Sequence, residues 1–152
     1  MSLKISFVLA MLALTPPALA QMIVEDAYAR SAGPMAQSGA VFLALTNAGD
    51  TDDRIVGVLS DAAARVELHT HIADEHGIMR MRPATAGFAV AAGATRWLQR
   101  GGDHVMFMGL TAPWRHGETI ALTLHFEQAA PVELRVRIDQ ERQARNEALP
   151  LQ

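Results

Sequence analysis

Two segments near the C-terminal end of the chain carry large apolar residues at every second position. The first runs from Ile120 to Phe126 and the second from Val132 to Ile138, with polar or small residues between the apolar ones. A period of two matches the pleat of a β-strand that has one buried and one solvated face, and it does not match a helix. The pattern therefore predicts antiparallel sheet in this part of the chain.

Shorter segments of β-branched and apolar residues precede these two, separated by Gly, Asn, Asp and Pro, and they predict further strands. Only residues 61–64 have the pattern of a helical turn. So many short strands in one domain predict an all-β fold, a Greek-key β-sandwich of two antiparallel sheets. The expected earlier strands are residues 23–30, 40–46, 54–59, 65–71, 77–82, 88–91, 95–98 and 104–108.

The two ends of the chain differ from the region between them. Residues 1–20 combine Lys4, an apolar stretch at 5–14 and the small-residue ending Ala18-Leu19-Ala20, which is typical of a secretory signal peptide. No second stretch is long enough to span a bilayer, so we expect an exported protein without stable membrane insertion. The expected division is a signal peptide at 1–20, a β-sandwich domain at 21–139 and a polar C-terminal tail at 140–152.

Charge and cysteine content exclude several classes of function. The net charge is −3 and no run of basic residues forms a stripe, which argues against a nucleic-acid partner. The chain has no cysteine, so lipid attachment through a thiol is not expected. Blue copper and dinuclear copper centres need thiolate, so any soft metal site here must use methionine and histidine.

Methionine and histidine are concentrated in three segments, His69-x-His71, Met79-x-Met81 and His104-x-Met106-x-Met108. Residues two apart on a strand share a face, so the members of each segment lie together. Leu68 belongs to the opposite face, and we therefore expect His69 and His71 to face outward with Glu67. Thioether and imidazole donors favour Cu(I) over zinc or hard cations, and copper binding should weaken below about pH 6.5 as the histidines protonate.

These segments resemble the periplasmic copper chaperone family PCuAC. The resemblance rests on Glu67-Leu68-His69-Thr70-His71, on Gly77 to Pro83, and on Gly101 to Leu110, and it extends over nearly all of the chain after residue 20. The family motif is His, eleven residues, Met, about twenty-one residues, then His-x-Met. Here eleven residues separate His69 from Met81, and twenty-two separate Met81 from His104. The extra residue falls where hairpin loops are expected, and loops accept insertions readily.

The resemblance implies a cupredoxin-like sandwich that binds one Cu(I) and passes it on without being an enzyme. Carried over by position, the ligands are His69, Met81, His104 and Met106. The implied acceptor is a copper protein such as subunit II of cytochrome c oxidase, or another copper chaperone, and the implied location is the periplasm.

Other interpretations remain open at the level of sequence. Met79 and Met108 are lower-ranking candidates, since isolated methionines on strands usually fill the core. His71 is a further nitrogen donor that could serve Cu(II). A copper-dependent enzyme on a β-sandwich, and an adhesion or scaffold module without metal, are the alternative functions. The remaining expectations are solvated His116 and His125, a low-ranking accessory ligand at His76, and packing roles for Trp97 and Trp114.

Overall fold

The computed structural model describes residues 21–143, and all ten strands expected from the sequence are present there. The signal peptide expected at residues 1–20 lies outside the described part. The described residues contain no helix, and so none long and apolar enough to cross a membrane. The strands are β1 (Met22–Ser31), β2 (Ser38–Asn47), β3 (Asp53–Leu59), β4 (Ala63–Ala73), β5 (Met79–Pro83), β6 (Phe88–Val90), β7 (Thr95–Leu98), β8 (His104–Leu110), β9 (Thr119–Phe126) and β10 (Val132–Ile138).

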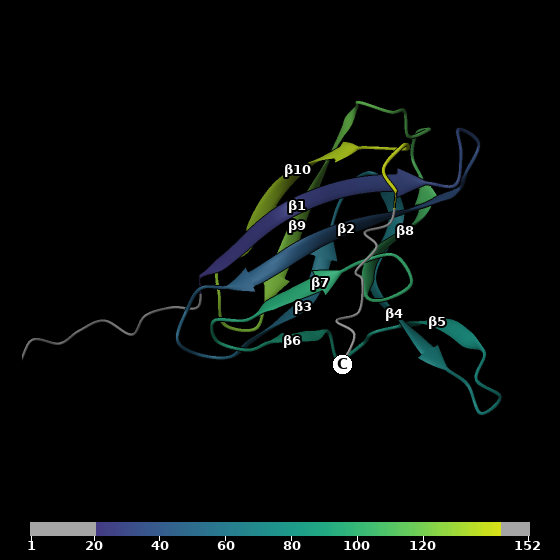
Figure 1. The fold of residues 1–152 in the computed structure, drawn as a ribbon. Helices are drawn as coiled ribbons and strands as arrows, with labels where there is room; N and C mark the ends of the chain where they lie inside the picture. The colour runs from purple at the N-terminus through teal and green to yellow at the C-terminus, as the bar shows by residue number, and fades with distance from the viewer. Residues whose placement is uncertain (1–20, 144–152) are drawn as a thin grey trace, which may run out of the picture.

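Strand pairing follows the order β5-β4-β8-β2-β1-β10-β9-β3-β6, with β7 added beside β2. This path curls over itself, so that β1 and β2 lie across β9 and β3 in Figure 1. Every pairing is antiparallel except that of β1 with β10, where Tyr28 is opposite Arg137. The all-β, sandwich-like architecture expected from the alternation is confirmed, and the parallel pair is a detail that the alternation could not predict.

The core lies between the curled layers and is filled by the alternating residues. On β9, Ile120, Leu122 and Leu124 are buried, and the residues between them are exposed or half-buried. Burying one such side chain contributes about 1.5–3 kcal/mol relative to leaving it in water. The alternation therefore fixes which face of each strand packs inward. The largest fully buried side chains are Phe107, Leu43, Leu45, Ile55, Leu98, Leu122, Leu124 and Ile138.

Two expectations about local structure need correction. Residues 61–62 form a simple turn and β4 begins at Ala63, so there is no helical turn at 61–64. The two residues left before β4 begins are too few to form a helical turn, because Ala63 and Ala64 already belong to the strand. Trp114 packs in the core as expected, edge-on to Phe107 at 5.1 Å between ring centroids. Trp97, by contrast, is 37% exposed and is not a core residue.

The first residues of the expected C-terminal tail contact the domain. The Gln140 side chain donates to the Trp114 carbonyl at 3.2 Å and accepts from the Ser31 amide at 3.1 Å. The Arg142 guanidinium lies over the Tyr28 ring, 4.3 Å from its centroid. Residues 140–143 thus pack on the sandwich, and the rest of the tail lies outside the described residues.

Candidate metal centre

The register of three neighbouring strands gathers the candidate ligands on one face of the sheet. Met81 on β5 is opposite His71 on β4. On the other side of β4, His104 is opposite His69, and Met106 is opposite Glu67. Directly opposed residues of antiparallel strands point to the same face. Five candidates, separated by up to 37 positions in the sequence, therefore share one face of the sheet. They are His69, His71, Met81, His104 and Met106.

The three histidine rings form a close group. The His104 ring centroid lies 5.9 Å from that of His69 and 5.5 Å from that of His71. Phe42 on β2 borders the group, with its ring 6.2 Å from that of His104. His71, which the family pattern does not include as a ligand, is thus at least as close to His104 as His69 is, and it is the cross-strand neighbour of Met81.

A single backbone carbonyl orients two of these rings. Nδ1 of His71 lies 3.0 Å from the Gly102 oxygen, and Nδ1 of His104 lies 2.9 Å from the same oxygen. A carbonyl can only accept, so both rings carry their proton on Nδ1. Each Nε2 then has a free lone pair. A backbone carbonyl that fixes the tautomer in this way is typical of metal-binding histidines.

The loop before β8 holds this carbonyl in place. The backbone amides of Gln99 and Gly102 donate to the carbonyls of Asp103 and Gln99, at 2.7 and 3.0 Å. The Asp103 carboxylate accepts from the Thr70 hydroxyl at 2.7 Å and from Arg96 Nε and Nη2 at 3.0 and 2.5 Å. Asp103 thus ties the loop to β4 and β7. Gly101, Gly102 and Asp103 are typical turn residues in the sequence, but the sequence gives no sign that the Gly102 carbonyl orients two histidines.

His69 has the opposite arrangement. Its Nε2 lies 3.0 Å from Oε2 of Glu67, while its Nδ1 is buried and has no hydrogen-bond partner among the described residues. A buried nitrogen without a partner costs about 1–3 kcal/mol in an apolar setting. Such an atom calls for an explanation, and a metal ion at Nδ1 supplies one.

Burial differs across the site. His69 and His104 are buried, with 8% and 3% of their surface exposed, whereas Met81 is 43% exposed. The expectation of an outward-facing His69 is therefore wrong. Its face of β4 is the predicted one, but on that face the ring lies beside the His104 ring and the Glu67 carboxylate. Burial also lowers the pKa of His104 below its ordinary value of 6.5, assisted by the nearby His71 and His69 and opposed by the hydrogen bond to Gly102.

The two lower-ranking methionines lie at the ends of the shared face. Met79 is opposite Ala73 and is 56% exposed, so it does not fill the core. The hairpin of β4 and β5 extends beyond the sandwich here, which leaves no second layer to cover it (Figure 1). Met108 is half-buried and its sulfur accepts a contact from Arg65 Nη2 at 3.3 Å. Neither is as close to the histidine group in the register as Met81 and Met106 are.

The other histidines are not brought to this face. His76 is exposed in the turn between β4 and β5. His116, just before β9, lies 3.7 Å from Asp139, just after β10. His125 on β9 was expected to be solvated, yet its Nε2 is buried and has no hydrogen-bond partner within residues 21–143. The expectation failed because strand alternation reports which side of a sheet a residue is on, not what covers that side.

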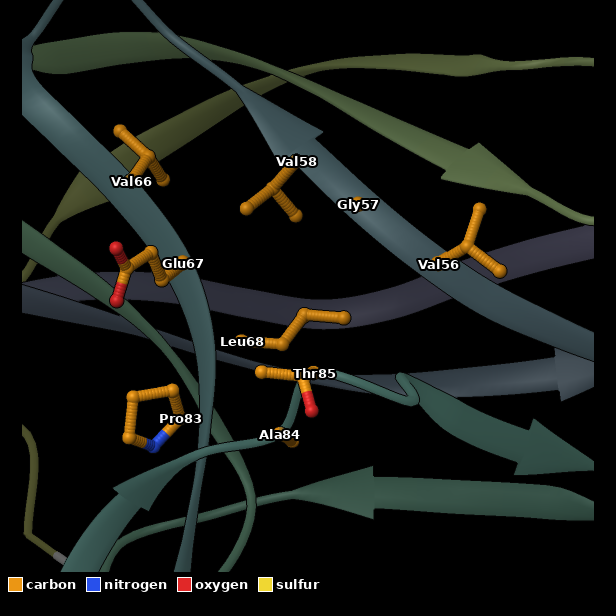
Figure 2. A pocket seen from close by; sticks show the side chains of 9 residues that line it. All are labelled: Val56, Gly57, Val58, Val66, Glu67, Leu68, Pro83, Ala84 and Thr85. Atoms are coloured by element: carbon orange, nitrogen blue, oxygen red, sulfur yellow. The ribbon is translucent and has the colours of Figure 1, made fainter.

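A cleft of about 510 Å³ lies behind the site, between β3 and the β4–β5 hairpin. Figure 2 shows Glu67 and Pro83 at one end of the cleft and Val56 at the other. The lining is mainly aliphatic, and Glu67 is its one carboxylate. The Glu67 side chain, which contacts His69, is 36% exposed, so solvent reaches it.

The donor set fits a soft ion better than a hard one. Within residues 21–143, no three side chains of His, Asp or Glu are arranged to hold a metal ion by themselves. The face instead combines imidazole nitrogens with the thioethers of Met81 and Met106. Such mixed nitrogen and thioether sets suit Cu(I), which accepts low coordination numbers, and give little to Mg²⁺ or Ca²⁺.

Comparisons with known proteins agree with this architecture. In the structure comparison, the chain is similar to the copper-bound PCuAC domain from PmoF2, with 19% identity, a TM-score of 0.65, and coverage of 81% of this chain and 96% of that one. It is also similar to the solution structure of CuI-DR1885 from Deinococcus radiodurans, with 27% identity, a TM-score of 0.60, and coverage of 85% and 83%. The likeness to the PCuAC domain of PmoF2 shows that this chain has the same fold, and the chain also shares that fold with CuI-DR1885.

Sequence comparison gives the family. The chain is 37% identical over 109 residues to "Putative lipoprotein Lxx21020" of Leifsonia xyli subsp. xyli, covering 70% of this chain and 63% of the length of that relative. The family model described as "Putative lipoprotein LpqE-like" matches residues 22–138, from the first strand to the last. The chain therefore belongs to the LpqE-like family.

Proposed function

We propose that this protein is an exported copper carrier that binds one Cu(I) on the β5-β4-β8 face and hands it to an acceptor protein. The proposed ligands are His69, Met81, His104 and Met106. His71 is added as an alternative or additional nitrogen donor because it lies between Met81 and His104 in the register. The observation that carries the proposal is the convergence of these residues on one face with ring nitrogens already oriented by hydrogen bonds.

The arrangement supports carriage and release better than catalysis. Neutral sulfur and nitrogen donors hold Cu(I) without a strong charge interaction, so transfer to a thiolate site would be favourable. Met81 is exposed, which gives an incoming ligand access to the metal. Glu67, opposite Met106 on this face, already contacts His69, which favours a positioning role for this carboxylate over one as a general acid or base.

The location, the copper acceptor and the domain boundaries are proposed as well. Export is proposed from the expected signal peptide at 1–20 and agrees with the lipoprotein description of the family. The periplasmic location is proposed from the resemblance to PCuAC. The acceptor is proposed to be the copper site of cytochrome c oxidase or another copper chaperone, by the resemblance to PCuAC. The domain boundaries proposed are 21–139 for the carrier domain and 140–152 for the tail, although residues 140–143 pack on the domain.

A Cu(I) titration of residues 21–152 against a chromophoric chelator tests the proposal. We expect one tightly bound equivalent, and weakening of at least tenfold for Met81→Ala and for His104→Ala. Met35→Ala and His76→Ala are matched controls, since both residues are exposed and neither lies on the shared face. Both controls should bind Cu(I) as the parent does.

The His71→Ala variant separates the two nitrogen assignments. If His71 is a ligand, this variant weakens Cu(I) or Cu(II) binding as much as His69→Ala does. A parent protein that fails to compete with the chelator, or site variants that bind as well as the controls, would show that the carrier proposal is wrong.

A further inference from the structure

Glu67 contacts the histidine group from the same strand that carries His69. It precedes His69 by two positions on β4, so both side chains lie on the shared face. Its Oε2 lies 3.0 Å from His69 Nε2, and its Oε1 lies 3.7 Å from Arg65 Nε. The carboxylate is thus held between a fixed cation and the imidazole.

The tautomer of His69 follows from these contacts. A carboxylate can only accept a hydrogen bond, so His69 carries a proton on Nε2. Protonating Nδ1 as well would place a donor in a buried position that offers no acceptor among the described residues. The neutral ring with its lone pair on Nδ1 is therefore the form that this environment favours.

We infer that Glu67 is a positioning residue that makes Nδ1 the ligand atom of His69. This inference rests on the proposed copper function. His104 serves as the contrast, because its Nδ1 donates to the Gly102 carbonyl and its free lone pair is on Nε2. The two buried histidines of the site thus offer different ring nitrogens, each selected by its hydrogen-bond partner.

The Glu67 carboxylate should also strengthen the bond between Nδ1 of His69 and copper. A hydrogen bond from imidazole to a carboxylate raises the basicity of the other ring nitrogen, which strengthens its bond to a metal. The Arg65 guanidinium lies beside this pair, 3.7 Å from Oε1 of Glu67 and 3.3 Å from the sulfur of Met108.

The test compares Glu67→Leu with Glu67→Gln in the full mature chain. Leucine removes the acceptor at similar size, while the glutamine oxygen can still accept the Nε2 proton, though more weakly because it is uncharged. We expect Cu(I) affinity to fall about tenfold to a hundredfold for Glu67→Leu and by less for Glu67→Gln. Glu133→Leu, an exposed carboxylate on β10, controls for the lost charge and should leave affinity unchanged.

Nitrogen-15 NMR of the histidine rings supplies a readout that a purely structural role would not move. In the parent without metal, we expect a protonated Nε2 on His69 and a protonated Nδ1 on His104. Adding Cu(I), which is diamagnetic, should shift Nδ1 of His69 and Nε2 of His104. In Glu67→Leu the preference for one tautomer of His69 should be lost, and in Glu67→Gln it should be retained in part.

The outcomes separate this inference from the carrier proposal. Binding of Cu(I) through Nε2 of His69, or a Glu67→Leu variant that binds as tightly as the parent, overturns the role of Glu67 and leaves copper carriage standing. A parent protein that binds no Cu(I) overturns both. Loss of affinity and of the tautomer preference in Glu67→Leu, with partial rescue in Glu67→Gln, establishes the assignment.

Discussion

Removing the Asp103 carboxylate should loosen the metal face without touching a proposed ligand. Asp103→Ala deletes the acceptor of three hydrogen bonds, one from Thr70 at 2.7 Å and two from Arg96 at 3.0 and 2.5 Å. These bonds fasten the loop whose Gly102 carbonyl orients His71 and His104. We therefore expect a loss of stability together with a loss of copper affinity.

The size of the stability loss can be worked from exposure. Hydrogen bonds to a charged group contribute about 1.5–3 kcal/mol each when shielded from water. The Arg96 side chain is 36% exposed and that of Asp103 is 16% exposed, so solvent screening reduces the ion pair to about 1 kcal/mol or less. With the part-buried bond to Thr70, the free energy of unfolding should fall by about 2–3 kcal/mol in total.

Urea denaturation followed by circular dichroism measures this loss, and the Cu(I) competition assay measures affinity. We expect the Kd for Cu(I) to rise about tenfold, because the Gly102 carbonyl orients the histidine ligands and losing such an orienting contact weakens metal binding. Glu127→Ala is the matched control, because Glu127 contacts Arg54 at 4.0 Å with both side chains exposed. If Asp103→Ala unfolds within about 0.5 kcal/mol of the parent and binds Cu(I) equally well, the role given to this loop is wrong.

Two further predictions concern the fold. Gly39→Ala should lower the free energy of unfolding by about 1–3 kcal/mol, because the new Cβ would lie 2.4 Å from the Trp114 ring. Gly57→Ala is the control and should be close to neutral, because a Cβ there meets no atom within 4 Å. Thermal melts of both variants measure the difference, and equal melting temperatures would contradict the prediction. The metal-free protein should lose stability as pH falls below about 6.5. Burial lowers the pKa of His104 in the folded protein, so the unfolded chain binds a proton at higher pH than the folded chain does and is favoured as pH falls. His104→Gln should flatten this slope in denaturation at several pH values, and an unchanged slope would refute the assignment.

Much of the fold could be predicted from the sequence because it is carried by local pattern. Apolar residues at every second position on β9 and β10 identify both strands and their buried faces. The same periodicity placed Met79 with Met81, and His104 with Met106, on common faces. The turn residues between segments marked where each strand ends, and all ten strands were found.

Burial of individual site residues could not be predicted in this way. The alternation put His69 on the correct face of β4, but its burial depends on neighbours such as the His104 ring, which comes from β8, distant in the sequence. Trp97 and His125 show the same limit, since one is exposed and the other has a buried ring nitrogen against expectation. Exposure depends on what lies across from a strand, and periodicity contains no information about that.

The sequence by itself determined the kinds of donor atoms available and the strands that carry them. With no cysteine in the chain, methionine and histidine were the only soft donors, and their spacing fixed which of them share a face. The tertiary structure decided that the three rings meet and that His71 and His104 share the Gly102 carbonyl, because His71 reaches that carbonyl only through the pairing of β4 with β8. Donor type is a property of side chains, whereas donor orientation depends on hydrogen-bond partners that only the folded chain brings together.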